Sequence, residues 1–236
     1  MKTYGLDPMH YYTTPGFTWD AMLKYTKVEL ELLDDIDMVL FIEKGIRGGI
    51  SQCSNRHAKA NNPYMKPENF NENEDINYIM YFDINNLYGW AMKYPLPYGN
   101  FEWVKQEDIK NIDFFVNDDS PVGYILEVDL DYPVDLHDQH KDLPFCPEHA
   151  TPPGAKQTKL LATLHDKKKY VIHYKYLQQV LENGLKLKKI HRVLKFQQRP
   201  WLRGYIDLNT RLRAQCLNEF EKNFYKLMNN AIYGML

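Results

Sequence analysis

Four stretches of the chain have the apolar, β-branched and aromatic composition of β-strands. Tyr78–Ile84 is almost continuously apolar, which predicts a buried strand. Gly123–Leu130 alternates apolar and acidic residues, which predicts a strand with one solvated face. Tyr170–Tyr174 and a basic stretch, Leu185–Leu194, complete the set. We therefore expect a sheet assembled mainly from the middle of the chain.

Helical spacing predicts four helices before the C-terminal region: Thr18–Lys27, Asp34–Glu43, Leu87–Met92 and Lys175–Asn183. Thr18 carries a hydroxyl suited to cap the first helix. Pro95 stops the third, and Gly184 ends the fourth in the position that favours a left-handed residue. Two polar or proline-rich stretches, Asn61–Asp75 and Thr151–Gly154, are predicted loops.

The C-terminal stretch Trp201–Ile232 contains Gly204 as its single glycine and no proline, so it is predicted to be helical. Asn218 followed by Glu221 resembles a capping box, with Asn in place of the usual Ser or Thr. This favours two antiparallel helices that turn near residues 216–218. One continuous helix is the alternative.

The composition is that of a globular chain of 236 residues, either one large domain or two small ones, with 44% apolar residues. The 18 tyrosines suit a surface that stacks on bases, although a tyrosine-rich core explains them equally well. No apolar run is long enough for a membrane span, and the N-terminal residues lack a signal-peptide pattern. Three distant cysteines favour a reducing, intracellular environment.

The net charge of −2 conceals an asymmetry between two parts of the sequence. Residues 1–150 contain 12 Lys and Arg against 26 Asp and Glu, whereas residues 151–236 contain 17 against 5. The net charges are thus −14 and +12. The basic part is a candidate for binding a polyanion, and the alternative is that the two parts neutralise each other.

Asp83 is the first candidate for chemistry, because it ends an apolar run where a sheet would meet solvent. Its carboxylate would hold a divalent cation, and backbone amides of the following turn would face a triphosphate. Tyr88, five residues later, would lie beside the same pocket. The alternative for such an aspartate is an ordinary helix cap or turn.

Four polar residues near the C-terminus lie within about 80° of one another on a helical wheel, so they share one helix face: Lys222, Lys226, Asn230 and Tyr233. Lysines bind phosphate as point charges, and a tyrosine ring stacks on a base. The alternative is a solvated basic face. The apolar residues of the same helix lie largely on other faces and are expected to pack: Phe220, Phe224, Leu227 and Ile232.

Three ordered motifs resemble those of family B DNA polymerases. Asp83–Gly89 is similar to motif A, D-x-x-S-L-Y-P, and Lys226–Gly234 to motif B, K-x-x-x-N-S-x-Y-G. Ile46–Gly49 resembles the Y-x-G-G motif of the protein-primed branch. The amino-acid sequences of Gly123–Pro133 and Gly184–Lys189 are similar to those of the polymerases of Maverick/Polinton transposons and related viruses. The resemblance extends over essentially the whole chain.

The resemblance assigns motif A roles residue by residue. It implies that Asp83 binds both catalytic Mg²⁺ ions, with the carbonyl oxygen of Ile84 on the nucleotide-side ion. Asn86 and Leu87 would offer backbone amides to the triphosphate. Tyr88 would lie under the sugar and exclude a 2′-hydroxyl.

The motif B roles follow in the same way. Lys226 would bind the incoming phosphates with help from Lys222. Asn230 and Tyr233 would line the base-pair pocket, and Gly234 would let the template strand approach.

Three further positions complete the implied site. A basic residue on the facing helix should join Lys226; Arg213 is the choice and Arg211 the alternative. Gly48 and Gly49 would lie beside the template strand. Ile46 replaces the motif's tyrosine, so the template contact of that tyrosine is not carried over.

The other departures are Asn86 for serine and Gly89 for proline in motif A, and Ala231 for serine in motif B. None of them removes a metal ligand. The family's second carboxylate lies in motif C, a D-T-D-like hairpin that would follow motif B, and neither it nor the thumb is found here. We therefore expect a fragment that also lacks most of the exonuclease domain and does not polymerise by itself.

The implied fold is α+β: a palm with a mainly antiparallel sheet flanked by helices, and a helical fingers pair at the C-terminus. The implied divisions are a connecting region with the Gly-Gly motif (1–75), palm strands with motif A (76–199) and fingers helices with motif B (200–236). Residues 95–153 would include part of an inserted subdomain that binds a priming protein.

The implied function is template-directed DNA synthesis by a two-metal mechanism, with primer-template DNA, dNTPs and a terminal protein primer as partners and no membrane. We expect a nuclear or viral replication site. The alternatives are a non-catalytic nucleic-acid-binding module or an inactive transposon remnant. His137, His140, Cys146 and His149 have a spacing compatible with zinc, but nearby aspartates favour a polar loop.

Overall fold

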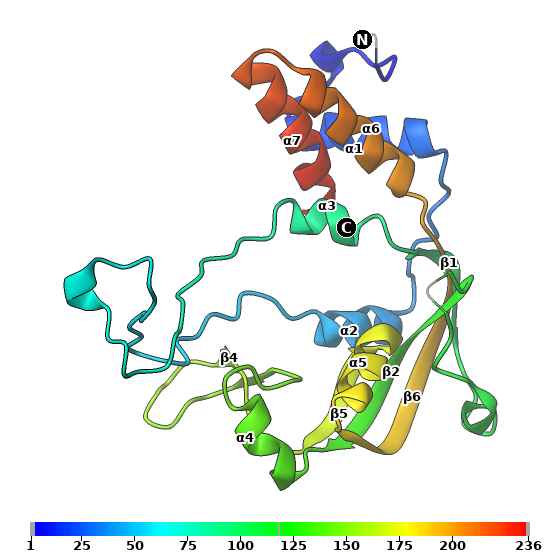
Figure 1. Cartoon of the computed structure of the whole chain (residues 1–236). Coiled ribbons are helices and arrows are strands. Elements are labelled where there is room, and N and C mark those ends of the chain that lie inside the picture. Colours follow the sequence, from blue (N-terminus) through cyan, green and yellow to red (C-terminus); the bar gives the residue numbers. More distant parts are fainter. Residues whose placement is uncertain (1–2, 118, 235–236) are drawn as a thin grey trace. The chain divides into compact units, whose positions relative to one another are not determined.

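The computed structural model describes residues 3–117 and 119–234. These residues divide into two compact units. The first unit combines residues 1–47, 86–137 and 165–236, and the second combines residues 48–85 and 138–164. The first unit contains a mixed helix-and-sheet fold, and the second consists mainly of loops (Figure 1).

The first unit is built on an antiparallel sheet of four strands in the order β1-β6-β2-β5. Its strands are β1 (Leu96–Trp103), β2 (Val122–Asp131), β5 (Lys167–His173) and β6 (Lys186–Arg199). The long β6 pairs with both β1 and β2, and the pairing contains bulges that curl the sheet. The antiparallel sheet expected from the sequence is therefore present.

Three of the predicted strands are confirmed as β2, β5 and β6, and β6 extends five residues beyond the expected end. β1 was not predicted, because Pro97 and Gly99 interrupt its strand-like pattern. The predicted solvated face of β2 is wrong at Glu127, which is 5% exposed. Lys44 and Arg192 cover and pair with this carboxylate.

Two helices flank the sheet. In α2 (Ile36–Gly45), Phe41 is buried against Val171 and Leu194. Asp35 accepts a hydrogen bond from the backbone N–H of Asp37, so the helix begins slightly later than predicted. α5 (Tyr174–Glu182) matches the predicted fourth helix.

Gly184 ends α5 as expected. Its φ of +96° lies in the region that favours glycine. A Cβ at this position would also lie 2.9 Å from Cδ1 of Leu136.

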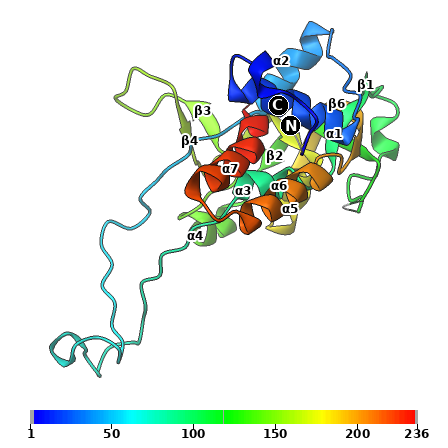
Figure 2. The same ribbon diagram turned by 90° about the horizontal axis from the view of Figure 1, so that it is seen from above.

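A helical layer forms the other part of the first unit. It contains α1 (Thr14–Thr26), α6 (Arg203–Gln215) and α7 (Glu219–Tyr233), and α1 packs on both C-terminal helices (Figures 1 and 2). Its buried residues come from all three helices and include Ala21, Met22, Tyr205, Ile206, Met228 and Ile232. The N-terminal segment therefore contributes to the core that holds α7.

The predicted division of the C-terminal stretch is confirmed, and the single continuous helix is excluded. α6 ends at Gln215, and the side chain of Asn218 accepts a hydrogen bond from the backbone N–H of Glu221 at 2.8 Å. The predicted packing role of Phe220 is wrong, because its side chain is 81% exposed. Leu227 is also exposed.

The first helix begins about one turn earlier than the sequence predicts. Thr13 caps α1, whereas Thr18 is buried inside it and donates its hydroxyl to the carbonyl oxygen of Thr14 at 2.8 Å. A threonine hydroxyl inside a helix often bonds back in this way, so a capping residue type alone does not locate a helix start.

The predicted strand Tyr78–Ile84 is wrong. The segment lies in the second unit without regular secondary structure, and Tyr81 and Phe82 are 92% and 81% exposed. Asn77, just before it, forms an isolated bridge with Asn61, but no described residue pairs with 78–84 as a strand. Strand propensity is not sufficient without a partner strand.

The remaining elements are short. They are the 3₁₀ helices Pro8–His10, Pro67–Asn69, Ile109–Asn111 and Val134–Leu136, the helices α3 (Leu87–Ala91) and α4 (His137–His140), and the paired strands β3 (Glu148–Ala150) and β4 (Lys159–Leu161). None of the helices in the described part of the chain has the length and apolar content to cross a bilayer.

Candidate functional site

The short helix α3 carries the second half of the predicted motif A. Asn86 precedes it with φ 57° and ψ 43°, a left-handed conformation that Asn adopts more readily than most residues. Its carbonyl oxygen accepts the backbone N–H of Trp90 at 2.9 Å, which closes the first turn. At the other end, Met92 is buried in the helical core. The C-terminal end of α3 is therefore anchored in the helical core.

The side chain of Asn86 lies over Gly89, which is buried between two exposed neighbours. A Cβ on Gly89 would lie 2.6 Å from Oδ1 and 2.8 Å from Cγ of Asn86. Such distances are far below van der Waals contact. A side chain at position 89 would therefore displace the exposed side chain of Asn86.

Tyr88 and Tyr233 stack on each other. Their ring centroids are 4.1 Å apart, and the ring planes differ by 13°. Tyr88 comes from α3 and Tyr233 from the end of α7, and the two helices are in contact (Figures 1 and 2). Both rings remain about half exposed, at 49% and 52%. Tyrosines from two distant predicted motifs thus form one aromatic surface that solvent can reach.

The predicted polar face of α7 is exposed. Met228 and Ile232 anchor the helix in the core, whereas Lys226 and Asn230 face solvent. Lys222 is half-buried and forms an ion pair with Glu219 at 2.9 Å. The charge of Lys226 is therefore more available to a ligand than the charge of Lys222.

Arg211 and Arg213 are both exposed on α6. No hydrogen bond or ion pair distinguishes one from the other in the described part of the chain, so the choice between them stays a prediction. Gly234, at the C-terminal end of α7, is also exposed.

Asp83 and Ile84 lie in the second unit, in the exposed segment described above. They therefore belong to a different unit from Tyr88, Lys226 and Tyr233. Among the described residues, no three His, Cys, Asp or Glu side chains gather in a way that would hold a metal ion. The residues considered for zinc, His137, His140, Cys146 and His149, therefore do not form such a group.

Gly48 and Gly49 begin the second unit and are exposed, and Gly49 has φ +80°. Arg47, which precedes them, belongs to the first unit and was not singled out by the sequence. Its guanidinium group lies 3.8 Å from the ring centroid of Tyr170 and donates to the carbonyl oxygen of Val171 at 2.7 Å. The only sequence signal for this role is the arginine itself, because a guanidinium group can stack on an aromatic ring and donate several hydrogen bonds.

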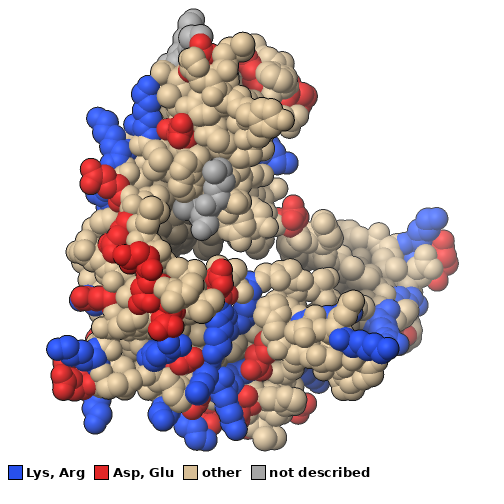
Figure 3. Space-filling model, turned by 180° about the vertical axis from the view of Figure 1, so that it is seen from behind, with Lys and Arg blue, Asp and Glu red and all other residues tan. Residues whose placement is uncertain are grey.

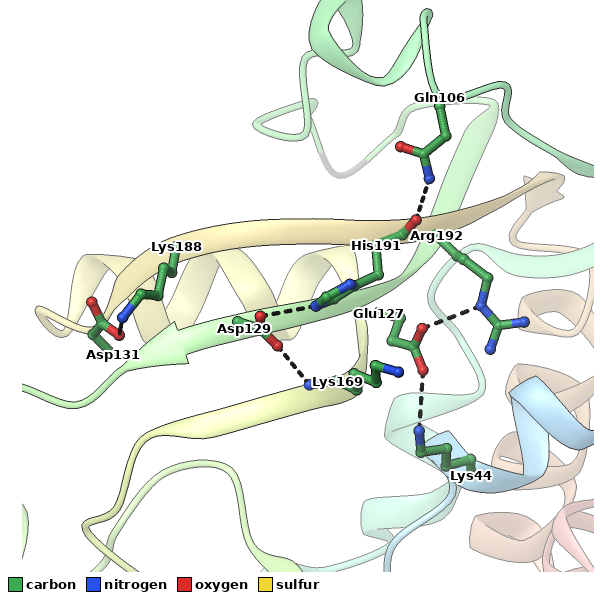
Figure 4. A network of polar contacts seen from close by, with 9 residues as sticks. All are labelled: Lys44, Gln106, Glu127, Asp129, Asp131, Lys169, Lys188, His191 and Arg192. Carbon is green, nitrogen blue, oxygen red and sulfur yellow. Dashed lines mark hydrogen bonds and ion pairs between the residues drawn. The ribbon is translucent and has the colours of Figure 1, made fainter.

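Acidic residues of β2 pair with basic residues of β6 and its neighbours (Figure 4). Glu127 lies 3.1 Å from Lys44 and 3.2 Å from Arg192. Burial alone would raise the pKa of Glu127, but the hydrogen bonds and charges of Arg192 and Lys44 outweigh burial and lower it. This part of the sheet is thus a neutralised surface.

The same pairing continues along both strands. Asp131 pairs with Lys188 at 3.0 Å, and Asp129 lies 2.9 Å from Nε2 of His191. Acidic and basic side chains are intermingled over the sheet on the face that Figure 3 shows. These pairs neutralise part of the charge asymmetry in the sequence.

An apolar cavity of about 500 Å³ lies between α3 and the sheet. Its lining includes Trp90, Tyr94, Phe196 and His173. Burial lowers the pKa of His173 to about 4, so this histidine is neutral at pH 7. Nδ1 of His173 accepts the backbone N–H of Lys175 at 3.3 Å and caps α5. No sequence pattern indicated this capping role.

The class of protein follows from a comparison with known protein families. Residues 35–235 match the model of the family described as DNA polymerase type B, organellar and viral. Because this match covers most of the sequence, the chain belongs to that family.

Solved structures share the fold. Phi29 DNA polymerase complexed with primer-template DNA and incoming nucleotide substrates is similar with a TM-score of 0.61 and 18% identity, over 95% of this chain and 36% of that one. An orthorhombic crystal form of Phi29 DNA polymerase gives 0.60 and 17%, over 97% and 37%. The complex of Phi29 DNA polymerase with single-stranded DNA gives 0.58 and 18%, over 98% and 35%.

The chain therefore spans little more than a third of the length of these solved structures. A comparison with curated protein sequences finds no match.

Proposed function

We propose that the chain supplies the nucleotide-facing part of a type B DNA polymerase active site. In the complete enzyme this site would transfer a nucleotide from a dNTP to the 3′-hydroxyl of a DNA primer. The observation that carries the proposal is the stacking of Tyr88 on Tyr233 at 4.1 Å. These residues are 145 positions apart, and each occupies the tyrosine position of a polymerase motif.

The stacked pair is proposed to receive the sugar and base of the incoming nucleotide. At 4.1 Å between centroids, no third ring fits between the two tyrosines. The sugar must therefore meet an outer surface of Tyr88, or the rings must separate. Against Tyr88, a 2′-hydroxyl would meet an aromatic ring, which would disfavour ribonucleotides.

Lys226 is proposed to bind the phosphates, assisted by Lys222 and by Arg213 or Arg211. Asn230 would contact the nascent base pair, and the backbone amides of Asn86 and Leu87 would face the triphosphate. As pyrophosphate leaves, the Lys226 ammonium would balance the developing negative charge.

Asp83 and the carbonyl oxygen of Ile84 are proposed as ligands for Mg²⁺. Both are exposed, and hard oxygen donors of this kind suit Mg²⁺, which commonly binds one or two carboxylates together with substrate phosphates. In this proposal the two residues would supply one side of a two-ion site. Bound Mg²⁺ would neutralise phosphate charge and orient the reacting groups.

DNA primer-template is the proposed macromolecular partner. Gly48, Gly49 and Gly234 would let the template backbone approach closely, because they carry no side chain. The motif sequences support the protein-primed branch of the family. A terminal protein is therefore a further proposed partner, and a Maverick/Polinton-type element is the proposed source. A nuclear or viral replication site is the corresponding location.

Titration of the chain with dNTP and Mg²⁺, followed by calorimetry, tests nucleotide binding directly. Lys226→Ala should weaken binding by about tenfold or more, because charged hydrogen bonds contribute roughly 1.5–3 kcal/mol. Lys222→Ala on the same helix face is the matched control and should have a smaller effect, because Lys222 is paired with Glu219. Equal effects would contradict the role given to Lys226.

Catalysis is tested by fusing the chain to a D-T-D-containing segment and thumb of a family member. The fusion should extend a primer, and Asp83→Asn should abolish extension. Tyr88→Val in the fusion should admit ribonucleotides. Failure to incorporate dNTPs with Asp83 intact would refute the catalytic proposal.

Binding of single-stranded DNA provides an independent test of the partner. The logarithm of the binding constant should fall with the logarithm of salt concentration by about 0.7 per phosphate contacted. A salt-dependent response without nucleotide binding would favour a non-catalytic binding module.

A further inference from the structure

The apolar cavity between α3 and the sheet has the size of a small-molecule site. Its volume of about 500 Å³ lies within the range of roughly 300–1,000 Å³ that is usual for ligand pockets. All of its lining residues belong to the first unit. Tyr88, Lys226 and Tyr233, which are proposed above to bind the nucleotide, are not among the described residues that line it. The cavity is therefore distinct from the proposed nucleotide site.

Aromatic rings line the cavity on two sides. On the α3 side, the rings of Trp90 and Tyr94 meet edge to face, with centroids 4.8 Å apart. On the sheet side, the ring of Phe196 lies 6.2 Å from the ring of His173, and the two planes differ by 28°. Trp90 is 57% exposed, so much of its indole is not covered by other described residues. A flat aromatic ligand would make offset-stacked and edge-to-face contacts with such rings.

His173 contributes a hydrogen-bond donor to this lining. Its Nδ1 accepts the backbone N–H of Lys175, so Nδ1 carries no proton. Because the ring is neutral at pH 7, its one proton is on Nε2. Nε2 bonds to no residue in the described part of the chain, and it is not one of the polar atoms sealed there without a partner. Since His173 lines the cavity, a ligand in it is offered an N–H donor.

The remaining polar groups of the lining narrow the kind of ligand. Among the described lining residues there is no Asp or Glu, and the one charged side chain is that of Lys175. The side-chain amide of Gln198 already donates to the hydroxyl of Tyr174 at 2.7 Å. A cationic ligand would therefore find a like charge and no carboxylate, whereas an acceptor oxygen would find Nε2–H of His173.

We propose that this cavity binds a small, flat aromatic molecule that carries a hydrogen-bond acceptor, such as a carboxylate or carbonyl oxygen. The ring system would lie between Trp90 and Phe196, and the acceptor would bond to Nε2 of His173. This site does not depend on the proposed polymerase function, so the failure of either proposal leaves the other standing.

Three probes with the same ring system test the site on the unaltered chain: naphthoate, naphthamide and naphthylmethylammonium. Naphthoate and naphthamide carry acceptor oxygens, and the third probe carries a cation without an acceptor. Naphthoate should bind with a dissociation constant of about 1 mM or tighter, as expected for a ligand of this size, and about tenfold more tightly than the cation. Absence of binding at 1 mM, or equal or tighter binding of the cation, would overturn the proposal.

His173→Phe tests the donor, because it keeps an aromatic ring and removes Nε2–H. Naphthoate and naphthamide should bind about tenfold more weakly, whereas naphthylmethylammonium should be unaffected. A merely structural effect, such as loss of the cap on α5, would weaken all three probes together, and that outcome would contradict the role of His173. If this variant does not fold, the probe series and the next pair of variants still decide.

Trp90→Ala and Tyr81→Ala form a matched pair that locates the ligand. Both side chains are exposed, but Trp90 lines the cavity and Tyr81 belongs to the apolar run of the second unit. Trp90→Ala should weaken naphthoate binding by about tenfold, because stacking on an aromatic ring contributes about 1–3 kcal/mol. Tyr81→Ala should leave it unchanged. Equal losses, or a loss with Tyr81→Ala alone, would show that the probe binds elsewhere and would overturn the proposal.

Discussion

Two stretches with similar strand signals have opposite environments. In β2, Leu126 and Val128 are completely buried, and the strand pairs with neighbours on both sides. In Tyr78–Ile84, Ile79 and Met80 are 63% and 67% exposed, and the segment is not part of a sheet. A strand is thus defined by its partners as much as by its residues.

Polar contacts hold the loop 61–77 of the second unit. Nδ2 of Asn61 donates to the carbonyl oxygens of Asn71, Glu74 and Asp75 at 2.9, 3.2 and 3.3 Å. Its Oδ1 accepts the backbone N–H of Asn71 at 2.9 Å, and its backbone pairs with Asn77. The buried Asn62 also donates to the carbonyl oxygen of Asn77 at 3.1 Å, so two buried asparagines close the loop 61–77.

The largest expected difference between the two apolar stretches is in the free energy of unfolding that is lost when a side chain is shortened to alanine. Leu126→Ala should lower the free energy of unfolding by about 2–5 kcal/mol, because it leaves a cavity in the sheet core. Ile79→Ala should change it by less than about 0.5 kcal/mol, as for most exposed sites. Urea unfolding measures both. A large effect of Ile79→Ala would show that the segment is buried in solution.

Glu127 should link the stability of the sheet to pH. Its pKa is lowered on folding, so its contribution is present above the ordinary value of 4.5 and is lost as the pH falls through the folded value. Glu127→Gln should remove this acid-sensitive component and cost about 1–3 kcal/mol at pH 7. Unfolding curves from pH 7 to pH 3 measure it.

Asp131→Asn provides the control for Glu127. Its pair with Lys188 is exposed, so the expected loss is about 0–1 kcal/mol. Similar losses from the two variants would contradict the special role of the buried carboxylate.

The loop should respond locally to changes at Asn61. Asn61→Asp replaces a donor with a carboxylate that faces three carbonyl oxygens, so amide hydrogen exchange at Asn71 and Asn77 should accelerate by about tenfold. The sheet amides should be unaffected. Asn73→Asp is the control in the exposed part of the loop. Unchanged exchange in Asn61→Asp would show that the loop is held by other contacts.

The sequence predicted most of the sheet and the C-terminal helices, because those elements have local signals. Alternation marks β2, and Gly184 and Asn218 mark helix ends. It also predicted an exposed face of α7, since Lys226 and Asn230 follow helical spacing. Such features depend on residues close together in the chain, and simple periodicity is enough to find them.

Features that depend on residues far apart in the chain could not be predicted from the sequence. The burial of Glu127 depends on Lys44, 83 positions earlier, and on Arg192. β1 depends on pairing with β6, which overrides Pro97 and Gly99. The motif resemblance assigned Tyr88 and Tyr233 to one nucleotide site but did not predict that their rings stack, and the packing of Asn86 over Gly89 was not predicted either. The roles given to Asp83, Gly48 and Gly49 stay predictions.

The contacts of Arg47 have a consequence for how the chain behaves at high concentration. β5 is an edge strand, and edge strands offer unpaired backbone groups to other chains. Arg47 occupies the carbonyl oxygen of Val171 on that edge, and the backbone N–H of Glu31 occupies that of Tyr98 on the opposite edge strand. Both borders of the sheet are thus partly protected against intermolecular strand addition and aggregation.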